Sequence, residues 1–141
     1  SEAIARNLAV MSELKTPIIV VITGEGGSGG ALAISVGDHL SMLEYATYSV
    51  ASPEACASII WRTAEKASDA ADAMKVSSGE LKKINIIDEI ISEPLGGAHR
   101  DYDLISQSIK SSIVNNLSKL SSLSSDDLVK RRYERLLKIG S

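Results

Sequence analysis

A glycine-rich segment is the part of the sequence best suited to chemistry. Residues 18–37 read IIVVITGEGGSGGALAISVG and contain six glycines. Glycine lets another molecule approach the main chain closely. We expect a buried strand over 18–23 and a short helix over 31–36, with the glycines between them. Main-chain N–H groups and the helix dipole favour negative charge at such a helix start, which predicts a site for a phosphate or an oxyanion.

Three interpretations of this segment are open from its residues. The first is a tight packing turn. The second is a dinucleotide fingerprint, because Gly24, Gly26 and Gly29 satisfy G-x-G-x-x-G and Glu44 follows about 20 residues later. Against it, a helical pattern precedes the strand, the following helix is short, and Gly30 stands where a Walker A loop requires lysine. The third is an oxyanion hole formed by the N–H groups of Gly29 and Gly30.

Composition limits the other classes of function. The chain has 141 residues, a net charge of −3 and a pI near 5.4, which argues against a nucleic-acid partner. No apolar run approaches the ~20 residues that span a bilayer, and no signal-peptide pattern is present, so we expect a cytoplasmic protein. The single cysteine, Cys56, excludes an internal disulfide, and the spacing typical of metal ligands is absent.

The remaining pattern predicts an α/β layer with parallel strands, because strands and helices alternate. We expect a helix over 2–14 and strands over 41–45, 48–50 and 86–91. Two helix starts carry capping signals, namely Ser52 before Pro53 and a capping box of Ser77 and Glu80. From residue 101 the pattern is helical, with a break over 121–125 and an apolar stripe of Ile105, Ile109, Ile113, Leu117 and Leu120.

Several long blocks, in order, resemble a known family. These blocks are SEAIARNL, GEGGSGGALAI, YSVASPEACASIIW, IIDEIISEPLGGAHRD and RRYERLLKIG. Together they are similar to the bacterial acetyl-coenzyme A carboxylase carboxyltransferase alpha subunits, over the C-terminal portion of that subunit. Three residues depart from the family pattern, namely Ser35, Ala51 and Ala55. None of the three falls on the glycine pair.

The resemblance implies a fold and a division of the chain. The family has the crotonase-like fold of the ClpP/crotonase superfamily, built from ββα units. We therefore expect residues 1–100 to be the C-terminal part of a crotonase-like domain and residues 101–141 to be a helical C-terminal extension. We also expect this chain to be a fragment that lacks earlier strands, so that an open sheet edge would make it aggregate or need a partner.

The resemblance also implies an activity. With a beta subunit, in an α2β2 heterotetramer, the family transfers carboxyl from N1-carboxybiotin on the biotin carboxyl carrier protein to acetyl-CoA. The product is malonyl-CoA, in the first committed step of fatty acid synthesis. We expect no biotin attachment and no metal in this chain. The alternatives are a dinucleotide-binding module and a non-catalytic scaffold subunit.

By motif, the family's oxyanion pair falls on Gly29 and Gly30, which would hold the ureido oxygen of biotin. We expect Gly26, Gly27 and Ser28 to contact substrate as part of the same loop, with a turn-stabilising hydroxyl as the alternative role of Ser28. This chemistry needs fixed dipoles, because negative charge collects on the ureido oxygen as biotin gives up its carboxyl group. It agrees with the absence of a recognisable Ser-His-Asp or Cys-His arrangement.

The other chemically capable side chains have structural interpretations. We expect Cys56 to be a small buried hydrophobe, His39 to be structural and Trp61 to lie in the core. The basic run over 130–138 is interpreted as a solvated helix face, with subunit docking as the alternative. Contact with a ligand or partner and a plain loop role are both open for two residues, Glu25 and His99.

Overall fold

Two successive ββα units form the centre of the chain in the computed structural model, which describes residues 2–139. The first unit contains β1 (Ile19–Ile22), β2 (Glu25–Gly27) and α2 (Ser28–Ile34), and the second contains β3 (His39–Leu43), β4 (Thr47–Ser49) and α3 (Pro53–Trp61). The remaining elements are α1 (Glu2–Glu13), η1 (Ala64–Lys66), α4 (Ala67–Ala73), α5 (Ser78–Lys83), β5 (Glu89–Ile91), η2 (Ala98–Arg100), α6 (Tyr102–Ser121) and α7 (Ser125–Leu137).

The strands form two sheets, and both are parallel, as the sequence predicts for the layer. The expectation of a plain loop after β1 is wrong for Glu25–Gly27, which form β2. The larger sheet has the order β1-β3-β5, and the smaller one pairs β2 with β4. The first strand of each ββα unit therefore enters the larger sheet and the second strand enters the smaller one. In the smaller sheet Gly26 lies opposite Tyr48, a pairing that bears on the glycine segment.

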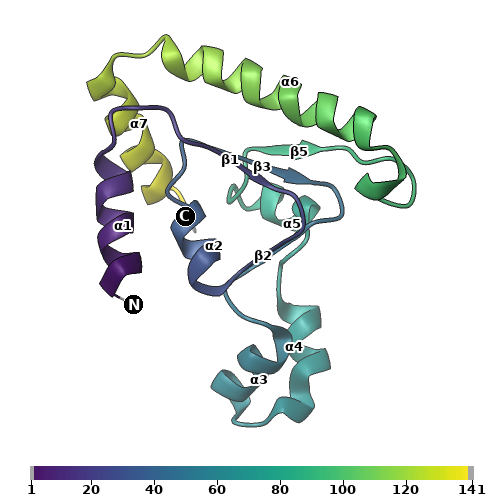
Figure 1. Cartoon of the computed structure of the whole chain (residues 1–141). Helices are drawn as coiled ribbons and strands as arrows, with labels where there is room; N and C mark the ends of the chain where they lie inside the picture. Colours follow the sequence, from purple (N-terminus) through teal and green to yellow (C-terminus); the bar gives the residue numbers. More distant parts are fainter. Residues whose placement is uncertain (1, 140–141) are drawn as a thin grey trace.

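The helices lie on both sides of the larger sheet (Figure 1). Helix α6 crosses one face and contacts β1 and β5, while α2 and α5 lie on the other side. Helices α1 and α7 stand side by side at one end, and α3 and α4 form a lobe that projects from the rest. Among residues 2–139, no helix combines the length and the apolar character that a membrane span requires.

The core consists of aliphatic side chains from the sheet and of a few from the helices. Leu40 and Met42 in β3 are 1% and 0% exposed, and the chain contains no phenylalanine to share the space. Ile105 of α6 belongs to the same cluster, so the helical C-terminal part packs on the sheet. The division of the chain at residue 100 stays a prediction.

Side-chain caps explain the starts of α3, α6 and α7. Ser52 accepts the N–H of Ala55 at 3.2 Å and Pro53 is the first residue of α3, so this predicted start is confirmed. The predicted capping box at α5 is wrong, because the side chain of Ser77 caps nothing. Glu80 instead pairs with Lys83 at 2.6 Å.

Two further predictions need correction. The strand expected over 86–91 is shorter, because the Asp88 carboxylate accepts the N–H of Leu40 at 2.8 Å and β5 begins only at the next residue. The apolar stripe of α6 is also rotated, since Leu117 is 43% exposed while Ser112 is buried. Ser112 faces the sheet because its hydroxyl donates to Glu89 at 2.7 Å.

A buried ion pair joins α7 to the sheet. Arg132 and Asp38 are both fully buried, and Nε and Nη2 of Arg132 donate to Oδ1 and Oδ2 of Asp38 at 2.9 and 2.8 Å. Asp38 also accepts the N–H of Ile18 at 2.7 Å, just before β1. The interpretation of residues 130–138 as a solvated face is therefore wrong for Arg132.

The other donors of Arg132 close the end of α1. Its Nη1 group donates to the carbonyl oxygens of Met11 and Leu14, both at 2.8 Å, and Nη2 donates to that of Thr16 at 3.0 Å. The last carbonyls of a helix lack intrahelical donors, so a guanidinium is a suitable cap. One side chain thus ties together α1, β1, β3 and α7.

We predict that Arg132→Ala lowers the free energy of unfolding by about 3–5 kcal/mol, because it leaves the Asp38 carboxylate buried and unpaired. Lys130 is exposed on the same helix, so Lys130→Ala is the matched control and should change stability by less than about 0.5 kcal/mol. Chemical denaturation of the native gene product measures both values. Equal losses in the two variants would contradict the assignment.

Candidate functional site

The glycine segment ends in an uncapped helix start. Helix α2 begins at Ser28, three residues earlier than the sequence predicts, so Gly29 and Gly30 lie in its first turn. First-turn N–H groups have no acceptor within their own helix. The N-cap residue is Gly27, which has no side chain to accept from them. The main-chain donors of Gly29 and Gly30 are therefore arranged to meet an acceptor from outside the helix.

The backbone at this start is strained. Ser28 has φ 56°, a left-handed conformation that costs a residue with a side chain about 1–2 kcal/mol. Residues in such conformations persist only where the surrounding structure holds them, and they cluster at functional sites. This observation agrees with the prediction that the segment does more than turn the chain.

A cavity of about 410 Å³ lies against the segment. Three of the five predicted site residues line it, namely Gly26, Gly27 and Ser28. The opposite wall comes from β4, the start of α3, and α4 with the residues that follow it, namely Thr47, Ser49, Ala51, Ser52, Pro53, Ala71, Met74 and Val76. Glu25, exposed at the start of β2, also lines this cavity. Gly29 and Gly30 lie beside it, in the adjoining turn of α2.

The space available for a side chain differs among Gly26, Gly29 and Gly30. A Cβ atom added at Gly30 would meet no other atom within 4 Å, and one at Gly29 would lie 3.5 Å from Cδ1 of Ile4. Gly26 is tighter, because a Cβ there would lie 2.9 Å from Cδ2 of Tyr48. Gly30 therefore has room in front of it that packing does not use, whereas Gly26 needs to be glycine for packing alone.

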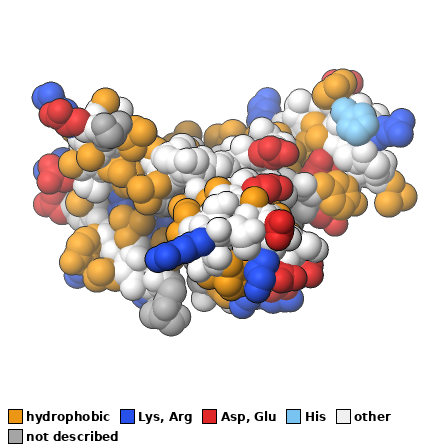
Figure 2. Space-filling view, turned by 90° about the horizontal axis from the view of Figure 1, so that it is seen from below, with side chains coloured by type: hydrophobic (Ala, Val, Ile, Leu, Met, Phe, Trp, Pro, Cys, Tyr) orange, Lys and Arg blue, Asp and Glu red, His pale blue; other side chains and the backbone are white. Residues whose placement is uncertain are grey.

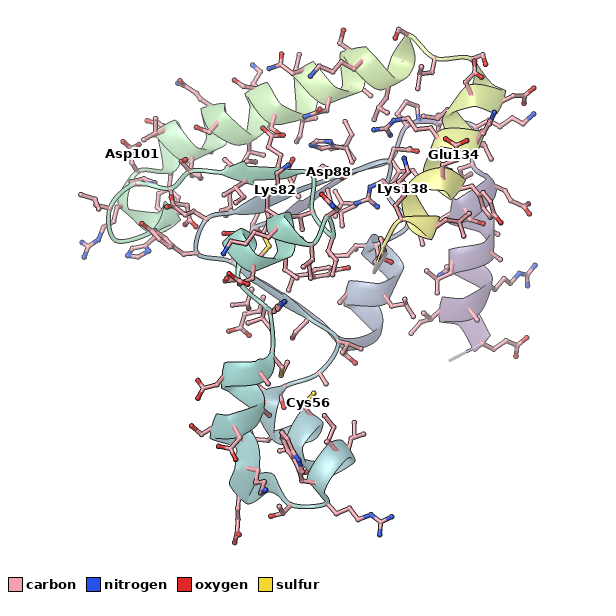
Figure 3. The ribbon with its side chains drawn as sticks, turned by 180° about the vertical axis from the view of Figure 1, so that it is seen from behind. Cys56, Lys82, Asp88, Asp101, Glu134 and Lys138 are labelled. Atoms are coloured by element: carbon pink, nitrogen blue, oxygen red, sulfur yellow. The ribbon has the colours of Figure 1, made fainter. Side chains whose placement is uncertain are left out.

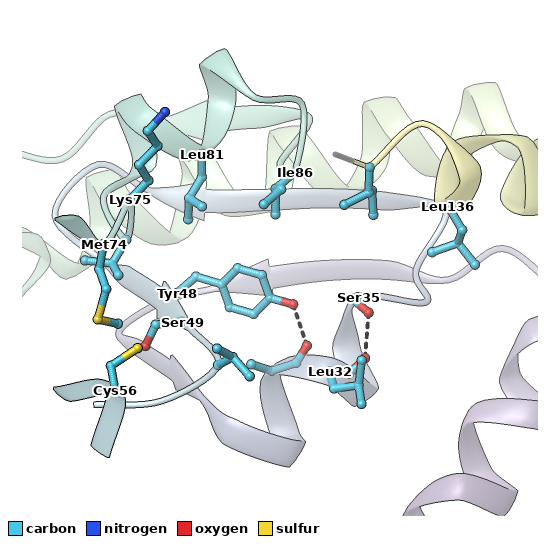
Figure 4. Close-up of a pocket in the computed structure, with 14 residues that line it drawn as sticks. Leu32, Ser35, Tyr48, Ser49, Cys56, Met74, Lys75, Leu81, Ile86 and Leu136 are labelled. Atoms are coloured by element: carbon cyan, nitrogen blue, oxygen red, sulfur yellow. Dashed lines mark hydrogen bonds between the residues drawn. The ribbon is translucent and has the colours of Figure 1, made fainter. Parts of the chain in front are cut away.

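A larger and more apolar cavity, of about 630 Å³, lies behind α2 (Figure 4). Tyr48 reaches through it from β4, and its hydroxyl donates to the carbonyl oxygen of Ala31 in α2. Burial raises the pKa of the Tyr48 phenol, so the group stays a neutral donor. Cys56 lines this cavity and is half-buried, which corrects the expectation of a buried core residue.

The far end of α2 is held by α7. Nη1 of Arg135 donates to the carbonyl oxygen of Ser35, the C-cap residue of α2, at 3.3 Å. The same guanidinium pairs with Asp88 at 3.0 Å, on the side of the sheet that faces α7 (Figure 3). A cation at a helix C-terminus also complements the helix dipole. Side chains from other elements thus hold the middle of α2, through Tyr48, and its C-terminal end, through Arg135.

A polar cluster between the larger sheet and α6 is structural. Oε2 of Glu89 accepts from Nε2 of His39 at 3.1 Å and from Ser41, Ser112 and Asn116 at 3.1, 2.7 and 3.0 Å. A catalytic triad uses the two nitrogens of its histidine for two partners. Here one nitrogen of His39 serves both Ser41 and Glu89, and Ser41 is completely buried.

Two other candidates lie apart from the glycine segment. The prediction that Trp61 lies in the core is wrong, since it is 38% exposed with Nζ of Lys66 at 5.6 Å from its ring centroid. His99 is exposed in η2, at the loop that precedes α6. Within residues 2–139, no cluster of three or more His, Cys, Asp and Glu side chains could hold a metal ion.

Sequence reasoning missed Tyr48 and Arg135, which hold α2, and the ion pair of Asp38 and Arg132, which joins α7 to the sheet. The only signal for the arginines is their i, i+3 spacing, which places both on one face of α7. Nothing in the pattern around Asp38 indicates a partner 94 residues away, and nothing around Tyr48 indicates a partner in α2.

The fold is similar to a solved structure described as a Pseudomonas malonate decarboxylase hetero-tetramer in complex with coenzyme A. The TM-score is 0.70, with 15% identity, over 93% of this chain and 52% of that chain. At that identity the likeness defines the fold alone. It confirms the crotonase-like α/β fold predicted from the sequence.

Residues 1–140 match the family described as acetyl co-enzyme A carboxylase carboxyltransferase-like, and this chain belongs to that family. A relative from Alcanivorax borkumensis, an acetyl-coenzyme A carboxylase carboxyl transferase subunit alpha, is 59% identical over 141 residues. Relatives of the same name from Photorhabdus laumondii and Pseudomonas putida are 58% and 59% identical over 140 residues. The chain is covered at 99–100% but spans 44% of the length of these relatives.

The open space at Gly30 generates a prediction about stability. Gly30→Ala and Gly79→Ala each place a methyl group where no atom lies within 4 Å, on short helices, and should each raise stability by about 0.5–1 kcal/mol. Gly26→Ala should lower it by about 1–3 kcal/mol because of the contact with Tyr48. Thermal unfolding of the three variants measures this, and a stable Gly26→Ala variant would refute the packing argument.

The Glu89 cluster generates a prediction about pH. Burial, the largest effect, would raise the pKa of Glu89, but hydrogen bonds from Ser112, His39 and Ser41 together hold it below its ordinary value of 4.5. A lowered folded-state pKa stabilises the fold above the unfolded pKa, and this contribution is lost as pH falls through the folded pKa.

Glu89→Gln should therefore flatten the decline in stability on acidification below pH 4.5, relative to the unmutated protein. Denaturant midpoints measured across that range at constant ionic strength test it. An unchanged pH profile in the variant would show that Glu89 does not carry this linkage.

Proposed function

We propose that this chain supplies the biotin-binding half of a carboxyltransferase site. With a beta subunit, in an α2β2 assembly in the cytoplasm, it transfers carboxyl from N1-carboxybiotin on the biotin carboxyl carrier protein to acetyl-CoA, giving malonyl-CoA. Membership of the family and the names of its relatives support this reading. The single observation that carries it is the uncapped first turn of α2, with two adjacent glycines.

The chain's part in the reaction is to stabilise charge. Biotin, when bound, supplies the carboxyl group, and its ureido oxygen gains negative charge as that group leaves. The N–H groups of Gly29 and Gly30 donate to this oxygen, and the dipole of α2 adds to the attraction. Gly26, Gly27 and Ser28, which line the adjacent cavity, shape the approach.

Glycine at positions 29 and 30 keeps the approach to these amides clear. The methyl group of an alanine at Gly30 would project into unfilled space rather than into the protein. Donors fixed before the reaction need no reorganisation while it proceeds, which makes such sites effective. The holding of α2 at its far end by Arg135 supports this role.

A partner on this side of the molecule is part of the proposal. Hydrophobic side chains gather over α1 and α2 in Figure 2, and Ile4 and Leu32 there are 41% and 56% exposed. On the neighbouring lobe, Ile59 and Ile60 of α3 are 76% and 61% exposed. Exposed apolar side chains at this density suit a surface that another subunit covers.

The dinucleotide alternative has no observation in its favour. Helix α2 has seven residues, which is short for a nucleotide-binding unit. The carboxylate of Glu44, which would have to bind ribose, accepts the N–H of Glu93 at 3.1 Å. Saturable binding of NADH, followed by fluorescence, would favour that alternative over ours.

The site assignment predicts the effect of a side chain at Gly30. In the native gene product assembled with its partner subunit, Gly30→Val should reduce the rate of carboxyl transfer about 10²–10³-fold, and Gly30→Ala should reduce it less. The reason is that the side chain blocks access to the amides while the helix stays folded. The assay follows malonyl-CoA decarboxylation in the presence of biotin.

Gly79→Ala is the matched control, because it also adds a methyl group in open space in a short helix but lies outside the site. It should leave the transfer rate unchanged. Full activity in the assembled Gly30→Val variant would refute the site, and a wild-type assembly without transfer would leave only a scaffold role.

A further inference from the structure

Tyr48 contacts the glycine segment on both sides of its reactive pair. Its ring lies against Gly26, so closely that a Cβ atom at Gly26 would be 2.9 Å from Cδ2 of Tyr48. Its hydroxyl donates to the carbonyl oxygen of Ala31, the residue directly after Gly30 (Figure 4). One side chain therefore spans the segment from the residue before the turn to the residue after it.

The backbone of Tyr48 is held by hydrogen bonds to the segments on either side of β4. Its N–H donates to the carbonyl oxygen of Val76 at 3.0 Å, and the N–H of its neighbour Thr47 donates to that of Gly24 at 2.9 Å. The side chain is 8% exposed, so its ring has little freedom. A side chain on a rigid strand is a precise support for a loop or a helix end.

The segment it contacts needs such support. Glycines are the most flexible residues of a chain, and no side chain caps the first turn of α2. Ser28 is in a strained left-handed conformation that the surrounding structure has to maintain. Without an outside restraint, the Gly29 and Gly30 amides would sample several orientations.

We propose that Tyr48 is a positioning residue, which aims the Gly29 and Gly30 amides by holding Gly26 with its ring and the Ala31 carbonyl with its hydroxyl. The inference rests on the proposed carboxyltransferase function. Tyr48 touches no reacting atom in this account. Its contribution is geometric, and geometric errors at a reacting centre cost rate rather than substrate affinity.

The test compares Tyr48→Phe with Tyr45→Phe in the native gene product assembled with its partner subunit. Tyr48→Phe keeps the ring against Gly26 and removes the hydroxyl. Tyr45 is 55% exposed and three residues away, so Tyr45→Phe is a matched loss of a phenol. Two quantities are measured: hydrogen–deuterium exchange of the peptide that covers α2, and kcat and KM for carboxyl transfer.

Tyr48→Phe should speed exchange in the α2 peptide about 10-fold and lower kcat about 10-fold, with the KM for biotin unchanged. Tyr45→Phe should change none of the three. A merely structural role for the hydroxyl would lower the unfolding temperature without moving kcat in the folded assembly.

Unchanged exchange in Tyr48→Phe would overturn the inference, whatever the activity. Increased exchange with an unchanged kcat would overturn it as well, because the amides would then not need aiming. A wild-type assembly that shows no transfer refutes the proposed function and, with it, the catalytic part of this inference. Those three results are distinguishable from one another.

Discussion

The buried ion pair between Arg132 and Asp38 is the interaction on which the arrangement of this chain depends. Two charges with no exposure to water are tolerated only when each finds several partners, and here the guanidinium also binds the carbonyls that end α1. The carboxylate in turn holds the chain before β1. Residues far apart in the sequence meet at this point, so α7 cannot leave without exposing uncompensated charge.

The position of α7, which this ion pair fixes, also affects the candidate site. Arg135 lies one helical turn beyond Arg132 and binds both Asp88 and the last turn of α2. Tyr48 binds α2 nearer its first turn. Helix α2 is only seven residues long and would be marginal alone, so these outside contacts determine where its glycine-bearing end points. The packing of α7 near the C-terminus thus helps to fix the direction of the Gly29 and Gly30 N–H groups at the start of α2.

Local patterns predicted β1, β3, β4 and the parallel pairing, because β-branched runs favour the strand conformation. They did not predict β2, since the glycines of Glu25–Gly27 favour a loop and enter a strand only by pairing with β4. They failed where a tertiary contact overrides the pattern. Leu117 continues an apolar stripe but is exposed, because Ser112 and Asn116 turn that face of α6 towards Glu89. Arg132 looked like part of a solvated run, since its partner lies 94 residues away. The capping box at Ser77 failed because Glu80 found Lys83 instead.

The central claim is that the main-chain donors of Gly29 and Gly30 hold the oxygen on which charge develops. A structure of the assembled enzyme with biotin bound tests it most directly, through the distances from the ureido oxygen to these two nitrogens. Our account predicts that both distances are about 2.7–3.2 Å, the range of a hydrogen bond. A ureido group bound well away from the first turn of α2 would contradict it.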